Sequence, residues 1–342
     1  MRWRRRPGAG GPARPDLVAP DAYSGRVSGP DETFLDLSLS RSTVHRAGAL
    51  RTDPAAITAA LSDPDTRVLT LRAGTAAVVG GEHPRLALRP PRPEDVPRPW
   101  LLGVEDGRTF LAVEDEPGAA DGTEPLGAAD GPEIVWRGLR DVGADLDDRD
   151  AGLLTTATAL AEWHQRHQHC PRCGARTVSE QGGWVRRCPA DDSQHHPRTD
   201  PAVIMAVTDA DDRLLLGSGV AWPEHRVSVL AGFVEAGESL EAAVVREVQE
   251  EVGITVTDLV YRGNQPWPFP ASLMLGFRAV ATSTDIVVDP VELRDAQWYD
   301  RARLAGEVAS GAATLPMKVS IARRLIEEWF GGPLPEPARE RR

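Results

Sequence analysis

The sequence has 342 residues, which is enough for two domains and a small additional module. Its formal net charge of −12 argues against a general nucleic-acid-binding surface, and no apolar run follows the basic start, so neither a signal peptide nor a membrane anchor is expected. The three cysteines all lie in one short segment, which is unlike a disulfide framework and indicates a reducing compartment such as the cytoplasm.

The N-terminal part of the chain predicts a tail followed by a β-rich domain. Residues 1–30 are expected to form a disordered, solvated basic tail. Residues 31–149 contain short apolar runs between turns rich in Gly, Pro and Asp, and these runs predict strands at residues 68–71, 101–104, 110–113 and 134–136. No catalytic constellation stands out in this domain.

Residues 150–199 predict a helix that leads into a zinc ribbon. Apolar residues recur at helical spacing from Asp150 to Gln168. Cys170 and Cys173 then form the first half of a zinc knuckle, and Cys188 follows after an interval suited to a ribbon. So small a segment has little core of its own, so zinc would contribute folding free energy rather than chemistry.

The pattern leaves three candidates for the fourth ligand of this zinc site. Among the nearby donors, His195 is the first choice because imidazole suits Zn²⁺ better than a lone carboxylate, and Asp191 and His196 follow in that order. The alternative is a ribbon that has lost its metal and is held by packing alone.

The last domain is predicted to span residues 200–332, with a C-terminal tail at 333–342. Apolar runs at residues 203–207 and 214–216 flank an Asp-rich turn and predict a hairpin. A helix is predicted from Leu240 to Val252, because Ser239 is a suitable N-cap and Gly253 a suitable left-handed stop.

Two acidic residues fall on the apolar face of this predicted helix. Glu247 and Glu251 lie one helical turn apart among valines, where two carboxylates repel each other and lose hydration unless cations neutralise them. Glu250 lies at the edge of the same face. The simplest remedy is Mg²⁺ or Mn²⁺, which prefer hard oxygen ligands. The loop at residues 232–237 turns backbone groups toward this site, which makes Ala231 a candidate backbone ligand.

A second motif, QPWPFPAS, occupies residues 265–272. Its three prolines fix the backbone and are expected to hold Trp267 and Phe269 in an extended arrangement that can stack on a flat ring. Gln265 and Ser272 offer hydrogen bonds to the same ligand. The alternative is a rigid connector whose aromatic side chains fill core.

These motifs together resemble a known family. The stretch GFVEAGESLEAAVVREVQEEVGI, residues 232–254, resembles the Nudix box. The segment at 264–272 is similar to the SQPWPFPxS signature of the NADH pyrophosphatase subfamily, also called NAD(H) diphosphatases, with Asn264 in place of the serine. A zinc ribbon upstream of the box belongs to the same subfamily. The resemblance implies an α+β protein with an α/β/α sandwich Nudix fold, a β-rich N-terminal domain and an intervening zinc ribbon.

The resemblance also implies roles for individual residues. Glu247 and Glu251 match metal-binding glutamates of the family, and Glu292 matches a further metal ligand outside the box. His196 falls where the family usually has a substrate-contacting tyrosine, and Ala322 matches a substrate-contacting alanine. The implied substrate-binding set is His196, Gln265, Pro266, Trp267, Pro268, Phe269, Pro270, Ala271, Ser272 and Ala322.

The implied activity is metal-dependent hydrolysis of the pyrophosphate of NAD(H) to AMP and nicotinamide mononucleotide by a homodimer. Glu251 and Glu250 are both candidates for the general base, and Glu247 completes the predicted catalytic set. Removal of an NAD cap from the 5′ end of RNA is a secondary hypothesis. The rivals are a Nudix hydrolase for ADP-ribose or a dinucleoside polyphosphate, and a non-catalytic zinc-ribbon binding protein.

Overall fold

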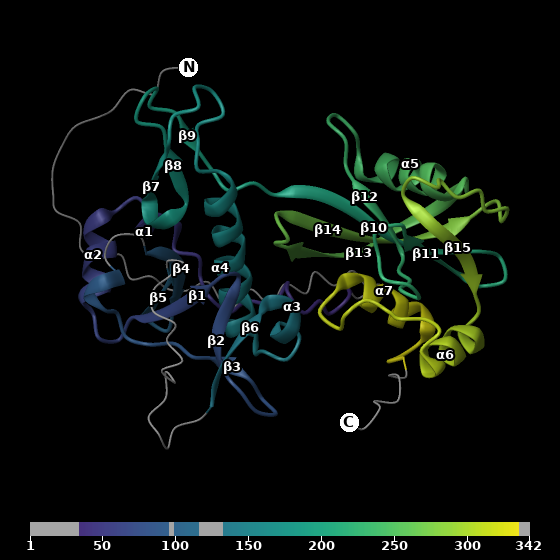
Figure 1. Cartoon of the computed structure of the whole chain (residues 1–342), viewed down its shortest axis with the longest axis horizontal. Coiled ribbons are helices and arrows are strands. Elements are labelled where there is room, and N and C mark those ends of the chain that lie inside the picture. The colour runs from purple at the N-terminus through teal and green to yellow at the C-terminus, as the bar shows by residue number, and fades with distance from the viewer. Residues whose placement is uncertain (1–33, 96–98, 116–132, 335–342) are drawn as a thin grey trace.

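The computed structural model describes residues 34–95, 99–115 and 133–334, which form two lobes with a small sheet at one end of the first lobe (Figure 1). The predicted tail at 1–30 lies outside the described residues, as does all but the first two residues of the tail predicted at 333–342. No helix in the described ranges is long and apolar enough to cross a bilayer.

The first lobe is built on a six-stranded sheet, which confirms the predicted β-rich domain. Its strands run in the order β3-β2-β1-β5-β4, with β6 paired to β2, and β1 and β5 are parallel. The four predicted strands are all present. The elements of this lobe are α1 (Gly48–Arg51), α2 (Pro54–Ser62), β1 (Arg67–Arg72), β2 (Thr75–Val79), β3 (Arg85–Leu86), η1 (Pro93–Asp95), β4 (Trp100–Glu105), β5 (Arg108–Glu114), β6 (Ile134–Gly138), α3 (Leu139–Val142) and α4 (Asp148–Arg166).

Helices cover both faces of this sheet. Leu69 and Leu71 of β1 point to one side and share a buried cluster with Leu153 and Leu154 of α4. Val68, directly before Leu69, points to the other side, where a separate cluster includes side chains of α1 and α2. The alternation follows from the two-residue period of a strand. The helix that leads into the ribbon therefore packs as part of the first lobe.

The segment with the three cysteines joins α4 to the second lobe and forms a small sheet, with the cysteines in the loops beside its strands. The sheet comprises β7 (Val178–Glu180), β8 (Val185–Arg187) and β9 (Gln194–His195), with the short helix η2 (Gln181–Gly183) between the first two. His164 of α4 bonds Gly183 O through Nε2 at 2.8 Å and Arg186 Nη1 through Nδ1 at 2.8 Å. A buried histidine between two fixed partners anchors the sheet to the helix.

The second lobe has the predicted α/β/α sandwich architecture. Its sheet runs β13-β14-β10-β11-β15, with β12 paired to β10. Figure 1 shows α5 on one side of the sheet and α6 and α7 on the other. The elements are β10 (Asp200–Thr208), β11 (Leu214–Gly219), β12 (Leu230–Phe233), α5 (Leu240–Val252), β13 (Val256–Trp267), β14 (Ser272–Ala281), β15 (Leu293–Tyr299), α6 (Arg301–Ser310) and α7 (Ile321–Phe330).

Central strand β10 shows why two layers of helix are needed. Val203 and Met205 pack in the cluster that contains the apolar face of α5, whereas Ile204 and Ala206 pack in the cluster that contains α6 and α7. Both faces of the strand are apolar, as expected for a strand buried on both sides. The predicted hairpin is present as β10 and β11, which pair antiparallel at Thr208 and Leu214.

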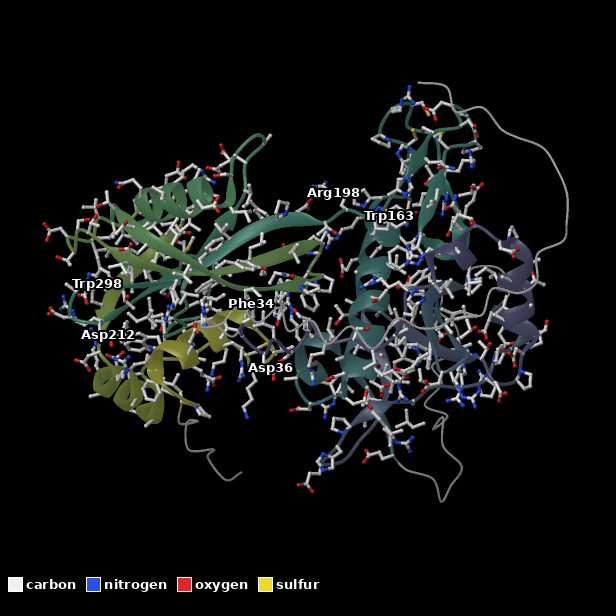
Figure 2. All side chains as sticks on the ribbon, turned by 180° about the vertical axis from the view of Figure 1, so that it is seen from behind. Phe34, Asp36, Trp163, Arg198, Asp212 and Trp298 are labelled. Atoms are coloured by element: carbon white, nitrogen blue, oxygen red, sulfur yellow. The ribbon has the colours of Figure 1, made fainter. Side chains whose placement is uncertain are left out.

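The chain start that the structure describes bridges the two lobes. Phe34 makes an edge contact with Tyr261, and Leu35 N donates to Arg262 O at 3.0 Å, so residues 34–35 lie along β13 of the second lobe. Asp36 O accepts from Arg324 Nε of α7 at 3.1 Å. Figure 2 shows Phe34 and Asp36 between the lobes. The first lobe is thus attached at a second place besides the ribbon.

Candidate active site

Helix α5 carries the predicted acidic pair and has the predicted ends. Ser239 Oγ accepts a hydrogen bond from Ala242 N at 3.2 Å, and Gly253 adopts a left-handed φ of 69°. Ala243, Val244, Val248 and Val252 are fully buried against the sheet. The helix is therefore fixed in rotation, and its two inward glutamates are fixed with it.

Three carboxylates converge beside this helix. The side-chain oxygens of Glu247, Glu251 and Glu292 lie within 4.8 Å of one another, although Glu247 and Glu251 are only 9% and 6% exposed. Glu292 arrives from the turn before β15, and that turn is tied to α5 because Asp289 N donates to Glu251 O at 2.9 Å. The structure thus brings together all three glutamates that the sequence predicted as metal ligands.

The protonation of these carboxylates reflects their crowding. Burial, followed by the charges of Glu247 and Glu292, raises the pKa of Glu251 to about 8. Burial is also the main cause that raises the pKa of Glu247. Oε2 of Glu251 is buried and has no hydrogen-bond partner among the described residues. A cation at this place would relieve both the repulsion and the missing contact.

Arg246 organises the acidic residues at the outer side of the cluster. Its guanidinium donates to Glu247 Oε1 at 2.8 Å, Glu250 Oε2 at 2.9 Å and both carboxylate oxygens of Glu238 at 2.8 and 2.9 Å. The hydrogen bond from Arg246 is the main cause that lowers the pKa of Glu238 to about 2. Glu250, a predicted candidate base, is therefore turned outward and paired with Arg246, and its side chain is 59% exposed.

Gly232 leaves the space that Glu247 occupies. A Cβ atom added at Gly232 would lie 1.8 Å from Glu247 Cδ and 2.1 Å from both carboxylate oxygens. Only glycine permits this approach of strand β12 and helix α5. A divalent cation of the Mg²⁺ type fits this site, because the donors are hard oxygen atoms and Glu251 Oε2 has no partner among the described residues. The space beside Gly232 holds the Glu247 carboxylate in the same group.

Two of the three carboxylates, those of Glu251 and Glu292, line a cavity of about 330 Å³ in the second lobe. Five predicted site residues line it, namely Ala231, Glu251, Glu292, Trp267 and Ala322. Its remaining lining residues include Ile204, Met274, Leu293, Pro316, Ser320 and Ile321. The arrangement places acidic oxygens at one part of a largely apolar cavity, as in sites that bind an organic phosphate through metal ions.

The proline-rich motif forms the turn between β13 and β14 rather than a free extended segment. Trp267 and Phe269 pack edge to face with ring centroids 5.0 Å apart, and Arg140 of α3 lies over Phe269, with Cζ 4.1 Å from the ring centroid. Both rings are half-buried against the core of the first lobe. The turn therefore serves both as core contact and, through Trp267, as cavity wall.

Of the ten predicted substrate-binding residues, only Trp267 and Ala322 are among the residues that line the cavity. Gln265 is completely buried, and its amide donates to Val319 O at 2.9 Å and accepts from Leu39 N at 3.4 Å. Its side chain is thus engaged inside the protein. His196 is exposed in the segment between β9 and β10 and is absent from the cavity lining.

Sequence reasoning missed two residues of the cavity wall, Trp222 and Arg226. They follow strand β11 in a loop whose closest signal in the sequence is an aromatic residue and an arginine four positions apart. That spacing has no fixed meaning outside a helix, so it could not identify them.

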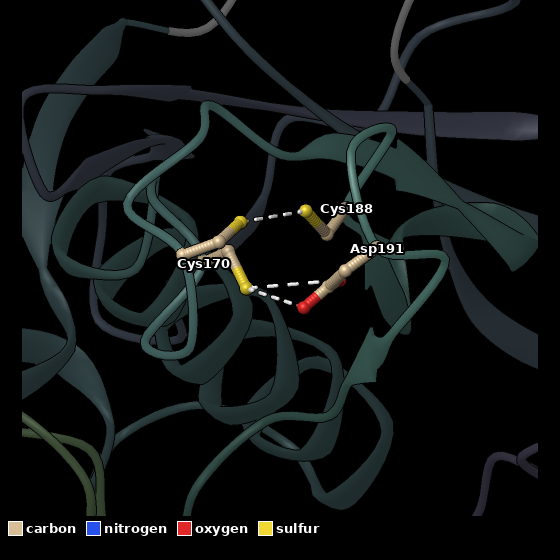
Figure 3. Close-up of side chains that lie close together, drawn as sticks. Cys170, Cys188 and Asp191 are labelled. Carbon is tan, nitrogen blue, oxygen red and sulfur yellow. Dashed lines mark hydrogen bonds between the residues drawn. The ribbon is translucent and has the colours of Figure 1, made fainter.

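The ribbon gathers a second set of metal-binding side chains. Donor atoms of Cys170, Cys173, Cys188 and Asp191 lie within 4.8 Å of one another. Cys173 Sγ is 3.4 Å from Cys188 Sγ, and Cys170 Sγ is 3.7 Å from Asp191 Oδ2. Figure 3 shows Cys170, Cys188 and Asp191 pointing toward one another. The three predicted cysteines therefore converge, as a zinc ribbon requires.

The fourth position of this group is held by Asp191, the second choice from the sequence. His195 Nε2 instead forms a 3.1 Å hydrogen bond with Ser193 Oγ, and Ser193 N donates to Asp191 Oδ1 at 3.0 Å. His195 is thus linked to Asp191 through Ser193. The donor set fits a tetrahedral zinc site with one carboxylate ligand.

Three family models match successive parts of the chain. The NADH pyrophosphatase-like rudimentary NUDIX domain matches residues 58–163, the NADH pyrophosphatase zinc ribbon domain matches 165–195, and the NUDIX domain matches 198–318. The matched ranges correspond to the first lobe, the small sheet and the second lobe.

Individual proteins show the same likeness. The NAD-capped RNA hydrolase NudC of Mycobacterium bovis is 40% identical over 319 residues, which cover 89% of this chain and 98% of that protein. The NAD-capped RNA hydrolase NUDT12 of Macaca fascicularis is 41% identical over 197 residues, or 54% of this chain and 43% of that protein. A NUDIX hydrolase structure from Nitrosomonas europaea superposes with a TM-score of 0.38 at 18% identity, covering 49% of this chain and 95% of that one.

Proposed function

Because the chain belongs to the Nudix hydrolases of the NADH pyrophosphatase type, we propose that it hydrolyses the pyrophosphate of NAD(H) to AMP and nicotinamide mononucleotide. The observation that carries this proposal is the group of Glu247, Glu251 and Glu292, of which the last two line a cavity together with Trp267. Carboxylates gather the cations that a diphosphate needs, and the indole offers a flat surface to one of the two bases.

Glu247, Glu251, Glu292 and the carbonyl of Ala231 are the groups that we propose hold Mg²⁺ or Mn²⁺. When bound, these ions neutralise phosphate charge and acidify a coordinated water. Arg246 keeps Glu247 in place through the 2.8 Å hydrogen bond, and Gly232 leaves room for its carboxylate.

Glu251 is the residue we assign as general base. Its carboxylate is buried at the cavity side of α5, and one of its two oxygens would accept the proton of an attacking water while the other would hold the cation. Glu250 is a weaker candidate in this arrangement, because its carboxylate is exposed and paired with Arg246. The base is thus distinguished from its neighbour by orientation on the helix.

We extend the proposal to RNA that carries NAD at its 5′ end. All residues that line the cavity belong to the second lobe. The relatives named above are NAD-capped RNA hydrolases, and this supports the extension to an RNA substrate. A homodimer, a cytoplasmic location and a zinc ion on the three cysteines and Asp191 complete the proposal. The free cysteines are available for that ion.

The deciding experiment is product analysis after incubation of the purified protein with NADH and either Mg²⁺ or Mn²⁺. AMP and reduced nicotinamide mononucleotide in equal amounts are expected. ADP-ribose and a dinucleoside polyphosphate serve as rival substrates, and Trp267→Ala is compared with wild type on each. If that variant cleaves NADH at the wild-type rate while ADP-ribose is the better substrate of both, the rival hydrolase is favoured. Capped and uncapped transcripts test the RNA extension separately.

A further inference from the structure

The cavity wall contains a cation that the proposed reaction has not yet used. Among the charged residues that line the cavity, Glu251 and Glu292 are acidic and Arg226 is basic. The guanidinium of Arg226 has neither a hydrogen-bond acceptor nor an ion-pair partner within residues 34–95, 99–115 and 133–334. A half-buried cation without an anion is costly, because it has lost part of its hydration.

Trp222 holds this guanidinium in position. Arg226 Cζ lies 5.0 Å from the centre of the indole ring, which is the geometry of a cation–π contact. The indole itself rests on the backbone of Gly219, where an added Cβ would come within 3.0 Å of Trp222 Cδ2. A side chain at position 219 would therefore displace the ring and, with it, Arg226.

The loop that presents this pair is fastened at both ends. Arg294 donates to Val220 O at 3.1 Å and to Trp222 O at 3.0 Å. On the other side of the loop, Thr314 N donates to His225 O at 2.7 Å, immediately before Arg226. Arg226 is thus fixed before any ligand arrives, which lowers the entropy that binding must overcome.

We propose that Arg226 is a substrate-binding residue that donates to the non-bridging oxygens of one phosphate of the dinucleotide. The inference rests on the proposed function and deepens it. Because its contact with Trp222 uses no N–H acceptor, the guanidinium of Arg226 has N–H groups left to bind a ligand, and its planar fork matches two phosphate oxygens. The carboxylates attract phosphate only through metal ions, whereas Arg226 binds it directly.

The test compares Arg226→Gln and Arg226→Lys with a control, Glu224→Gln, which changes an exposed residue of the same loop. With NADH and Mg²⁺, Arg226→Gln is expected to raise KM by about tenfold or more and to lower kcat/KM by at least the same factor, because a charge-assisted contact to the cleaved pyrophosphate is lost. The KM of Arg226→Lys should lie between those of wild type and Arg226→Gln, since lysine keeps the charge without the planar fork. Glu224→Gln should match wild type.

Product inhibition identifies the phosphate. AMP and nicotinamide mononucleotide are titrated as inhibitors, and the inhibition constant of one of them should rise in Arg226→Gln by the same factor as KM. Unchanged KM and unchanged inhibition constants in both Arg226 variants would overturn the inference while leaving the hydrolase intact. If wild type does not cleave NADH, the proposed function falls, and calorimetric titration of AMP and nicotinamide mononucleotide into the same variants still decides the role of Arg226.

Discussion

Replacing Glu251 by glutamine should stabilise the protein and inactivate it at the same time. In the structure the carboxylate is 6% exposed and lies within 4.8 Å of two further carboxylates. Burial and then the charges of Glu247 and Glu292 raise its pKa from 4.5 to about 8. The amide of Glu251→Gln has nearly the same shape, carries no charge and can donate to the neighbouring carboxylates.

The magnitude follows from linkage between protonation and folding. Because the folded pKa is the higher one, the stability contributed by this group is complete below pH 4.5 and is lost as the pH rises toward about 8. At pH 7 the loss corresponds to about 2.5 pKa units, or roughly 3 kcal/mol of unfolding free energy. Glutamine does not titrate, so the variant avoids that loss when no divalent cation is added.

The assay is urea unfolding in buffer without added Mg²⁺ or Mn²⁺, followed by turnover of NADH with the metal present. We expect Glu251→Gln to unfold at higher urea than wild type and to turn over at least about two orders of magnitude more slowly. A gain in stability together with a loss of turnover rules out misfolding as the cause of the lost activity. A variant that is less stable than wild type without metal, or that hydrolyses NADH at near-normal rates, would refute the reasoning.

Three further predictions test other parts of the structure. Gly232→Ala places a methyl group on the Glu247 carboxylate and should reduce turnover by about 100-fold or more. Its control, Gly306→Ala, lies in a helix with open space and should keep full activity and gain about 0.5–1 kcal/mol of stability. Similar activities of the two variants would contradict the close approach of Gly232 and Glu247. Burial lowers the pKa of His164 to about 4, below its unfolded value of 6.5, so wild type should lose about 2 kcal/mol of stability between pH 7 and pH 5 as the unfolded state takes up a proton. Urea unfolding of His164→Gln should lack that part of the loss, and equal slopes would exclude it. Asp191→Ala should lower the zinc content measured by atomic absorption more than His195→Ala does, and the reverse order would restore the histidine as ligand.

The predictability of this protein from its sequence depended on whether a residue's role is local. Helix α5 was predicted to the residue, because its cap, its period and its stop are encoded within fifteen positions. The three cysteines converge as their spacing indicates. In both cases the chain close to the residue determines its neighbours.

Roles that depend on distant segments were not accessible in this way. Gln265 was interpreted as a ligand contact, but Leu39 N, 226 positions away, takes its carbonyl oxygen. Asp191, and not His195, belongs to the group of zinc donors because the turn after β8 folds back on Cys170. The composition of the segment does not reveal this fold. Arg226 enters the cavity only because Arg294 and Thr314 fix its loop from later strands and turns. Contacts between residues far apart in the sequence, rather than local propensity, determine the role of each of these residues.

The burial of Gln265 also shows why the first lobe matters for chemistry in the second. Its amide needs partners, since a buried unpaired amide costs about 1–3 kcal/mol, and one of them is Leu39 N from the segment that the first lobe supplies. Its other partner, Val319 O, belongs to a residue whose side chain is packed in the core of the first lobe. Ser320 to Ala322, directly after Val319, line the cavity, and Trp267, two residues after Gln265, lines it from β13. The packing of the first lobe therefore sets the position of two walls of the cavity, although the described part of that lobe contributes no carboxylate to the site.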